Sequence, residues 1–581
     1  MLKNIDKSIF LVIYFLLIEI KQLKINLINF INLLKLVKII PYFSGKIVFR
    51  NKHQNSFLKL NSEINNNKNT IKKYTKKNKI IVESLINHPM YTLPNCIIAN
   101  KLREIYNLEC IGIIREGDIS AEKIMKSFNI NSVIKLNRSN FFSRFFFYIK
   151  AIKIIGFNKS IKWLINYKSN KIEIGKNVYE HYVRNKKIPG PKKISAPFYR
   201  FFSNALLYDD QFKKTFKNIK ISYWVQAEHQ FIPHRILFQN ALLKKANVLA
   251  RFGIKNISVR NYKNFNEKNS NRSGYNKRLI KYLFKDLRYI LLKKANKKIN
   301  FSLKKKIGNE DRLLNIKSNK KQLFKNKKEL CDYFRWEINK PIVLILAHEL
   351  TDGNFNNEWN LFLDDKDWLV ETLKKIKKVK DVNWIIKPHP SEVIYNSKIN
   401  AKTIFKENIK DNEKNLGLFP GNYEIKNLYK FISAAITSHG TAGYEYPVLG
   451  IPTIVCGDSS YYQLGFNLEP KTKIEYFKIL SNIKYIKPLT REQQDMSKVF
   501  WYVFNFLGKA EIPTIYHSNI NMNYDKEKFW KQSLKLLKRQ GKYQGNFYKS
   551  FEYQLKNNNS NLINIKKLFD IKKTIDLKNF D

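Results

Sequence analysis

A chain of 581 residues is too long for one ordinary core, and its length predicts at least two domains. With 44% hydrophobic and 14% aromatic residues, the composition excludes a disordered protein. The formal net charge of +60 suits nucleic-acid binding, but lysine and asparagine are spread over the whole chain, as in NNNKNTIKKYTKKNK at 65–79, and we expect no nucleic-acid partner. Attraction to an anionic membrane surface or to phosphorylated substrates is the expected use of the charge.

The cysteines indicate a reducing compartment. Cys96, Cys110, Cys331 and Cys456 form no C-x-x-C pair, and no histidine lies near enough in the sequence to complete a zinc site. So few thiols in so long a chain are typical of reduced, buried side chains in a cytoplasmic protein. We therefore expect no disulfide and no metal.

The N-terminal region, residues 1–50, is apolar and basic. Residues 9–18 (IFLVIYFLLI) are wholly apolar, but the run stops at Glu19, short of the roughly 20 residues that span a bilayer. No small-residue cleavage site follows, so we expect no secretory signal. Residues 25–40 carry asparagine or lysine at every third position, which gives no clean amphipathic face. We expect helices that lie on an anionic membrane surface, peripheral at the inner membrane, with plain packing on the protein body as the alternative.

The next part of the chain predicts a polar linker at 51–78 and a Rossmann-like α/β domain at 79–335. A strand, a helix and a strand within about 35 residues make a βαβ unit with a parallel sheet. A lysine- and asparagine-rich connection, helical in part, occupies 265–335. The expected elements are strands at 79–85, 110–114 and 219–226 and helices at 95–106, 236–246 and 278–294.

A second alternating βα domain is predicted at 336–515, followed by a helix at 526–539 and a polar tail within 516–581. Open α/β sheets bind ligands at the carboxyl ends of their strands, so chemistry is expected in strand-to-helix loops. The expected elements of this domain are strands at 341–346, 382–386, 434–437 and 452–456 and helices at 367–379, 425–431 and 442–449.

The loop TSHGTAGYE at 437–445 directly follows one of these strands. Small residues let the backbone approach a ligand, and amides at a helix N-terminus bind phosphate. Ser438 and Thr441 add hydroxyl donors, while Glu445 can accept from ribose or sugar hydroxyls. An ordinary tight turn is the alternative interpretation, because glycines alone are weak signals. We predict that this loop, with His439 and Gly440, binds a nucleotide.

The loop KPHPSE begins at Lys387, where a buried strand ends. Prolines on both sides hold His389 in place at the strand end. A fixed imidazole can donate a hydrogen bond to a phosphate or, as a cation, stabilise a departing phosphate. Lys387 can add charge, and a structural histidine that serves a loop carbonyl is the alternative.

The two loops, with AHELTDGN upstream, resemble bacterial glycosyltransferases of capsule polysaccharide and surface-carbohydrate biosynthesis. That group includes proteins similar to the Kdo transferases and, more distantly, the polysialyltransferases. The resemblance is strongest over 341–480 and weaker over 80–260. It implies a GT-B fold of two facing Rossmann-like domains, a metal-independent inverting transfer, and a His-Pro motif that contacts the donor phosphate. No cofactor is expected beyond the nucleotide-sugar donor.

Carried to this sequence, the resemblance gives the phosphate contact to His389, with Ser438, Gly440, Thr441 and Glu445 lining the same nucleotide. The acceptor and the catalytic base are expected in the N-terminal domain, because an inverting transfer needs a carboxylate or a histidine to take a proton. Relatives are expected to have an aspartate at the position of Glu180. On the donor side, Asp352 is expected to shape a loop. Candidate bases lie in three loops: Glu116 and Asp118, Glu180 and His181, and Glu228 and His229.

Several functions remain open at this stage. The leading hypothesis is transfer of a sugar, for instance from a CMP-linked donor, to a growing surface polysaccharide or lipid-linked glycan such as lipopolysaccharide. A nucleotide-sugar 2-epimerase shares the architecture, but its usual cluster of carboxylates is not evident. A polyol-phosphate transferase also uses His-Pro histidines, and a basic nucleic-acid-binding protein is the non-enzymatic alternative. The donor sugar, the linkage and the oligomeric state are not predicted.

Overall fold

The protein is described here by a computed structural model, which divides the chain into two compact units. Unit 1 contains residues 1–181, 192–268 and 511–552, and unit 2 contains 182–191, 269–510 and 553–581. The connection expected in the first domain therefore belongs to unit 2 from Asn269 onward, and the C-terminal segment is shared between the units. The structure describes residues 7–23, 25, 52–66, 75–136, 140–253, 256–270, 277–304, 322–355, 359–410, 413–516 and 525–571.

Unit 1 is built on a seven-stranded sheet in the order β13-β6-β5-β4-β1-β2-β3. Its pairs from β3 across to β5 are parallel, and β6 runs antiparallel to β5. The register places Ile81 opposite both Ile111 and Trp224, so buried apolar residues line the middle of the sheet. The strands are β1 (Thr75–Ser84), β2 (Leu108–Arg115), β3 (Ser132–Leu136), β4 (Lys220–Gln226), β5 (Asn247–Phe252), β6 (Asn256–Tyr262) and β13 (Ala510–Glu511).

The helices of unit 1 begin where the sequence offers caps. In α3, His88 accepts a hydrogen bond from the Met90 amide and Pro89 occupies the first turn, where its missing N–H costs nothing. The predicted linker at 51–78 is wrong in part: it contains α2, whose buried Asn61 and Asn65 are bonded to Ser127. Satisfied amides let this polar segment pack. These helices are α2 (Lys52–Asn66), α3 (Pro89–Tyr106), α4 (Ile119–Ser127), α6 (Ile161–Asn166), α7 (Ile174–Lys186), α8 (Ala196–Thr215), α9 (His234–Leu243), α18 (Lys526–Gln540) and α19 (Asn546–Lys556).

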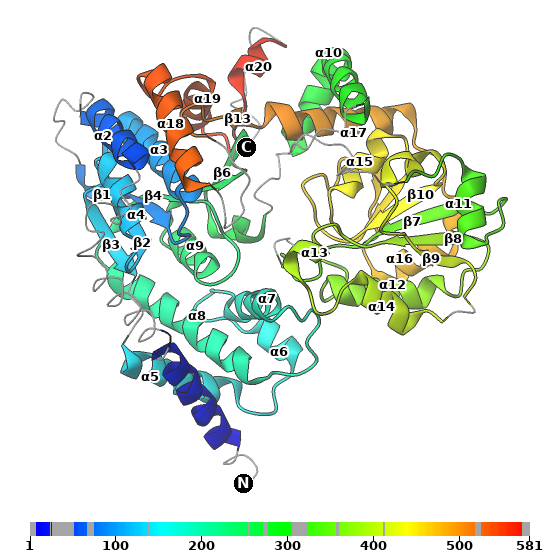
Figure 1. The fold of residues 1–581 in the computed structure, drawn as a ribbon, viewed down its shortest axis with the longest axis horizontal. Helices are drawn as coiled ribbons and strands as arrows, with labels where there is room; N and C mark the ends of the chain where they lie inside the picture. The colour runs from blue at the N-terminus through cyan, green and yellow to red at the C-terminus, as the bar shows by residue number, and fades with distance from the viewer. Residues whose placement is uncertain are drawn as a thin grey trace, which may run out of the picture. The chain divides into compact units, whose positions relative to one another are not determined.

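The apolar N-terminal run is part of a helix over residues 7–23, which packs on α5 (Phe141–Ile155). The dark blue helix lies beside α5 in Figure 1. Its Phe15 lies against the rings of Phe141, Phe145 and Tyr148. Among the described residues, no helix combines the length and the hydrophobicity that crossing a membrane requires. The second predicted N-terminal segment, 25–40, lies outside the described residues except for residue 25.

Unit 2 is built on a six-stranded, wholly parallel sheet in the order β12-β11-β10-β7-β8-β9. The central part of each sheet repeats one order, in which the first strand lies between the second and the fourth. This is the order of a Rossmann fold, and it leaves a switch point between the first and fourth strands, here β7 and β10. The strands are β7 (Ile342–Leu346), β8 (Asn383–Lys387), β9 (Leu416–Leu418), β10 (Ala434–Thr437), β11 (Thr453–Val455) and β12 (Asn467–Leu468).

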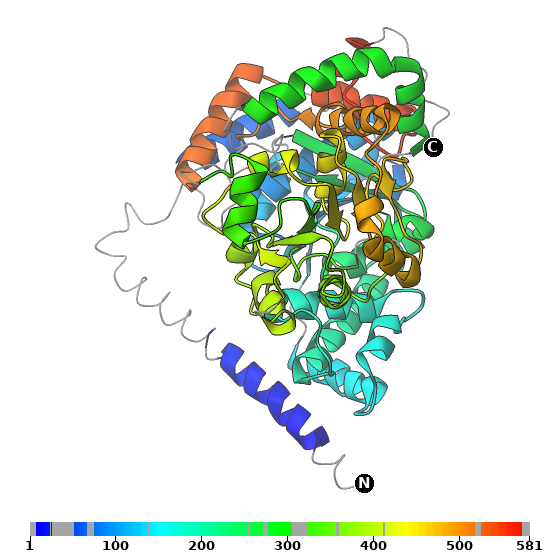
Figure 2. The same cartoon turned by 90° about the vertical axis from the view of Figure 1, so that its right-hand side faces the viewer.

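Helices cover both faces of this sheet. Alternate residues of β7 face opposite cores: Leu344 lies in a cluster with α10, α15 and α17, and Ile345 in a cluster with α12 and α14. The long α10 runs beside α17 at the top of Figure 2. The predicted fold class, an α/β protein with two Rossmann-like domains, is confirmed for each unit. The helices are α10 (Lys277–Lys304), α11 (Lys327–Phe334), α12 (Asp365–Ile376), α13 (Glu392–Tyr395), α14 (Ala401–Asn408), α15 (Ala442–Val448), α16 (Lys473–Ser481), α17 (Arg491–Tyr502) and α20 (Ile565–Phe569).

Candidate functional site

The carboxyl ends of β7, β8 and β10 surround a cavity of about 230 Å³ in unit 2. It lies at the switch point of the sheet, where open α/β folds bind ligands. Five residues predicted for the donor site line it together, although two of them are about 50 positions from the others in the chain. They are Lys387, His389, Gly440, Thr441 and Glu445. His348, which follows β7, also lines the cavity and was missing from the predicted site.

His389 is fixed by the loop that follows β8. The backbone N–H of Ser391 donates to its Nδ1 at 3.2 Å, so the neutral ring carries its proton on Nε2. Burial lowers the pKa of His389 to about 3, and the nearby charges of His348 and Lys387 act in the same direction. The imidazole is therefore a neutral hydrogen-bond donor at pH 7, whereas the sequence had left a cationic form open.

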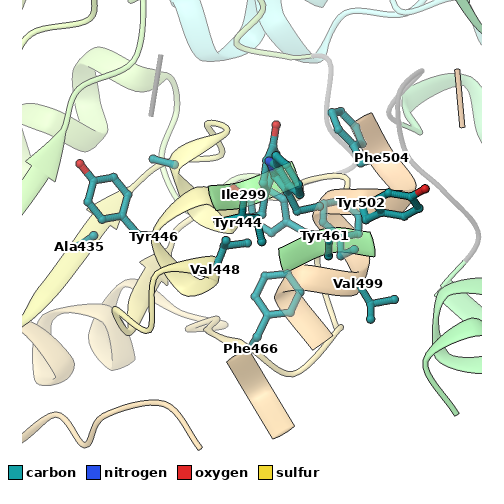
Figure 3. Close-up of a cluster of buried hydrophobic side chains, with 14 of the residues drawn as sticks. Ile299, Ala435, Tyr444, Tyr446, Val448, Tyr461, Phe466, Val499, Tyr502 and Phe504 are labelled. Carbon is teal, nitrogen blue, oxygen red and sulfur yellow. The ribbon is translucent and has the colours of Figure 1, made fainter. Parts of the chain in front are cut away.

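The loop between β10 and α15 is held by a buried tyrosine. The Tyr461 hydroxyl donates to the Gly440 carbonyl at 2.6 Å, and the Gly443 amide donates to the same oxygen at 3.0 Å. Figure 3 shows Tyr461 with Tyr444 and Phe466 in one cluster of buried hydrophobic side chains. α15 has only seven residues, so its dipole contributes less to anion binding than the sequence suggested.

Replacing Tyr461 with phenylalanine is expected to lower the free energy of unfolding by about 1 kcal/mol, the usual net value of one neutral hydrogen bond. The Gly440 carbonyl keeps its second donor, so the loop should loosen without collapsing. Urea denaturation measures the change. The matched control is Tyr462→Phe, which removes only an exposed bond from Lys471 and should change stability by less than half as much.

A buried carboxylate lies behind the cavity, in the first turn of α12. Asp365 is 3% exposed, and its two oxygens face two different histidines. Nδ1 of His348 lies 3.2 Å from Oδ2, and Nδ1 of His439 lies 3.6 Å from Oδ1. The rings of the two histidines are 4.3 Å apart, and the ring of His389 is 5.8 Å from that of His348.

The carboxylate sets the charge of these histidines. Burial opposes a charge on His348, but Asp365 outweighs burial and raises the pKa of His348 to about 9. Burial lowers the pKa of His439 to about 4, because one carboxylate cannot hold two adjacent imidazolium ions. The pKa of Asp365 falls well below its usual range, since the attraction of the histidines exceeds the effect of burial. The cavity wall thus holds one imidazolium ion, on His348.

The same three side chains are the candidate metal ligands among the residues that the structure describes. Ligand atoms of His348, Asp365 and His439 all lie within 4.8 Å of one another. Nδ1 of His348 lies nearest one oxygen of Asp365 and Nδ1 of His439 lies nearest the other, so the carboxylate faces both histidines as an electrostatic partner. The expectation of no metal remains a prediction.

Ser438 and His439, also predicted for the donor site, do not line the cavity. Ser438 is buried with its hydroxyl against Asp365, and His439 is held by the same carboxylate. Both therefore support the wall from behind. Asp352 accepts a hydrogen bond from Tyr395 and lies 3.5 Å from the guanidinium of Arg184, contacts that fit its predicted role in shaping a loop.

The candidate bases of unit 1 are divided among several places. Glu116 is exposed at the carboxyl end of β2 and lines a cavity of about 420 Å³ together with His181. Burial lowers the pKa of His181 to about 4, so its ring is neutral. Asp118 is the N-cap of α4 and accepts from the Ala121 amide, which gives it a structural task.

Glu180, Glu228 and His229 do not line that cavity. Glu228 accepts the backbone amides of His229 and Gln230, and the His229 ring is buried edge-on against Phe238. Glu180 is buried on α7. The charges of Glu180 and Glu228 both act on the buried guanidinium of Arg235, whose pKa burial lowers. Backbone amides thus hold Glu228 in place, and both carboxylates act electrostatically on the buried guanidinium.

No family model matches the chain, and no curated protein matches it. Among solved structures, the chain is similar to a β-Kdo 2,4-transferase of Thermosulfurimonas dismutans, with 15% identity, a TM-score of 0.31, and coverage of 49% of this chain and 80% of that one. A glycosyltransferase of Rickettsia africae is 14% identical, with a TM-score of 0.23 and coverage of 74% and 95%.

A UDP-GlcNAc 2-epimerase of Methanocaldococcus jannaschii is also similar, with 12% identity, a TM-score of 0.23, and coverage of 74% of this chain and 99% of that one. The group named by the sequence resemblance is thus among the similar structures. So is the epimerase alternative.

Proposed function

We propose that the protein is a glycosyltransferase that moves a sugar from a nucleotide-linked donor to a surface polysaccharide or lipid-linked glycan. The observation that carries the proposal is the cavity of unit 2, where His389, Lys387 and the Gly440–Thr441 backbone converge at the switch point of a parallel sheet. Hydrogen-bond donors and cations gathered in one small cavity suit the phosphate of such a donor.

In this proposal the side chains around the cavity have distinct tasks. Nε2–H of His389 donates to a phosphate oxygen, and the imidazolium of His348 balances the charge that grows on the leaving phosphate. Glu445, near the start of α15, accepts from a sugar or ribose hydroxyl. The base is expected from unit 1, where Glu116 and His181 are the candidates that line a cavity. Inversion and metal independence belong to the proposal as well.

Calorimetric titration with CMP-, UDP-, GDP- and dTDP-linked sugars tests the donor site. We expect one nucleotide class to bind, and His389→Ala to weaken that binding about tenfold, the effect of losing one hydrogen bond to a charged group. The control is His53→Ala, which removes a half-buried histidine of α2 in unit 1 and should leave affinity unchanged.

Binding of none of the four classes, or equal affinity of wild type and His389→Ala, would refute the donor site. Conversion of a UDP-sugar without any acceptor would favour the epimerase instead. Transfer in the presence of EDTA tests metal independence. If chelation abolishes transfer and a divalent ion restores it, His348, Asp365 and His439 are the first residues to replace.

We also place the protein at the cytoplasmic face of the inner membrane. The helix over residues 7–23 supports this, since the face opposite Phe15 presents exposed Ile13, Leu17 and Ile20 at helical spacing. An exposed apolar stripe beside lysines fits an interfacial helix on anionic lipids.

A further inference from the structure

The 420 Å³ cavity of unit 1 lies at the carboxyl ends of β1, β2 and β3, where Leu85, Arg115 and Leu136 line it. It therefore occupies the ligand-binding edge of the first sheet, as the donor cavity does in the second. α8 contributes more of the remaining lining than any other element, and its share is mostly polar, including Ser203 and Asn204. A polar cavity at this edge is built for a ligand with many oxygens.

Three arginines surround this cavity. Arg144 of α5 is bonded to Glu19 of the N-terminal helix at 2.6 Å, so its charge is balanced. Arg115 and Arg200 take part in none of the ion pairs among the residues that the structure describes. Glu116 is the other carboxylate on the wall. Two guanidinium groups without an ion pair on the wall of one polar cavity are suited to bind a phosphate.

One wall of the cavity is the N-terminal helix itself. Phe15, Glu19 and Gln22 point inward, while the outer face of the same helix is apolar and uncovered, with Phe10 62% and Leu17 60% exposed. Phe142 of α5, in the neighbouring helix, is 78% exposed. An uncovered apolar ridge of this kind marks contact with a membrane or a partner.

We propose that this cavity binds the phosphate of a membrane-anchored amphiphile, with the helix over residues 7–23 lying in the bilayer surface beside it. The occupant is a lipid phosphate, because one helix contributes both to the cationic cavity and to the apolar ridge. The cavity can bind the phosphate headgroup while the ridge contacts the apolar chains of the bilayer. The inference rests on the proposed function, for which it names the acceptor as a lipid-linked phosphate.

Flotation of the full-length protein with phosphatidylcholine vesicles tests the site. The vesicles contain either phosphatidic acid or phosphatidylserine, adjusted to equal surface charge. Preference for phosphatidic acid is expected, since its phosphate is a monoester that two arginines can reach. Arg200→Gln and Arg115→Gln should each weaken binding to phosphatidic acid vesicles about tenfold. Leu17→Gln should weaken binding to both kinds of vesicle.

The matched control is Lys214→Gln, which removes one charge from the same helix, α8, but only an exposed pair with Asp210. Equal binding by Arg200→Gln, Arg115→Gln and Lys214→Gln would overturn the site. If Arg200→Gln fails to fold, Arg115→Gln still tests the site, because Arg115 is exposed and its replacement leaves the core intact.

Inorganic phosphate separates the two possible sources of the ligand. If inorganic phosphate stabilises the wild type against thermal unfolding but not Arg200→Gln, and the protein shows no preference between the two kinds of vesicle, the cavity is a site for free phosphate. That result would overturn the lipid assignment. No nucleotide sugar enters these experiments. If the protein prefers phosphatidic acid vesicles but binds none of the four nucleotide-sugar classes, the lipid-phosphate site stands and the proposed transferase activity is refuted.

Discussion

Replacing Asp365 with asparagine is expected to lower the free energy of unfolding by about 3 kcal/mol at pH 6, because it removes one partner of a buried ion pair. The variant leaves His348 and His439 facing an amide in place of a carboxylate. It should also weaken the binding of the donor, since His348 would no longer hold its proton at neutral pH. Urea denaturation and donor titration measure the two effects.

The pH dependence of this difference has a defined sign. The pKa of His348 is raised from 6.5 to about 9, so its contribution to stability is complete below pH 6.5 and is lost as the pH rises to 9. The pKa of Asp365 is lowered from 3.8, so its contribution is present above pH 3.8 and is lost as the pH falls. The difference in the free energy of unfolding between wild type and Asp365→Asn should therefore be largest between about pH 4 and 6.5 and should decrease toward pH 9.

The matched control is Glu371→Gln on the same helix, α12. Its partner Lys374 is 54% exposed, and exposed pairs contribute less than about 1 kcal/mol. A gap between wild type and Asp365→Asn that stays constant from pH 6 to pH 9 would show that His348 is neutral throughout.

The sequence was sufficient to predict the elements that form the cavity of unit 2. Strand-to-helix loops at Lys387 and Gly440 follow apolar runs with clear boundaries, and both loops line one cavity. Parallel strands bring their carboxyl ends to one edge, so two loops far apart in the chain meet there without any local signal. The loops that carry His389 and Thr441 could therefore be expected to meet, and both residues line the same cavity.

The pairing of His348 with Asp365 could not be predicted in the same way. These residues are separated by a loop with little regular structure, in which the buried Glu349 is bonded to Thr351 and Ser397. Asp365 begins a helix next to Asp364 and Asp367, where acidic residues are ordinary caps. Asp364 and Asp365 are both buried, and only the tertiary contacts show that Asp365 faces the histidines while Asp364 caps the helix.

The candidate bases of unit 1 show a second reason why side-chain positions could not be predicted from the sequence. Glu228 and Glu116 both follow strand ends, yet Glu228 turns back to accept two amides and Glu116 faces a cavity. Local hydrogen bonding decides between these outcomes, and a sequence does not show which amides a carboxylate will reach. Likewise, the segment at 51–78 resembles a linker in sequence, because a buried hydrogen bond such as that from the Asn61 amide to the Ser127 hydroxyl leaves no hydrophobic pattern.

Replacing Gly443 with alanine is expected to cost about 3 kcal/mol of stability, at the upper end of the range for overpacking a core. A methyl group at this position would overlap the phenol of Tyr461. That ring is 2% exposed and packed against Tyr444 and Phe500, so it can move aside only by disturbing these neighbours. Donor affinity should fall too, because displacing the ring breaks its bond to the Gly440 carbonyl. Thermal unfolding and donor titration are the measurements.

Gly421→Ala is the matched control, since a methyl group there meets no atom within 4 Å. The double variant Gly443→Ala, Tyr461→Leu separates the clash from the lost hydrogen bond. Leucine removes the part of the ring that the methyl group would overlap, so the double variant should be more stable than the sum of the single losses predicts. Its donor affinity should stay low, because no hydroxyl then holds Gly440. Recovery of both properties together would mean that Tyr461 only fills space below the loop.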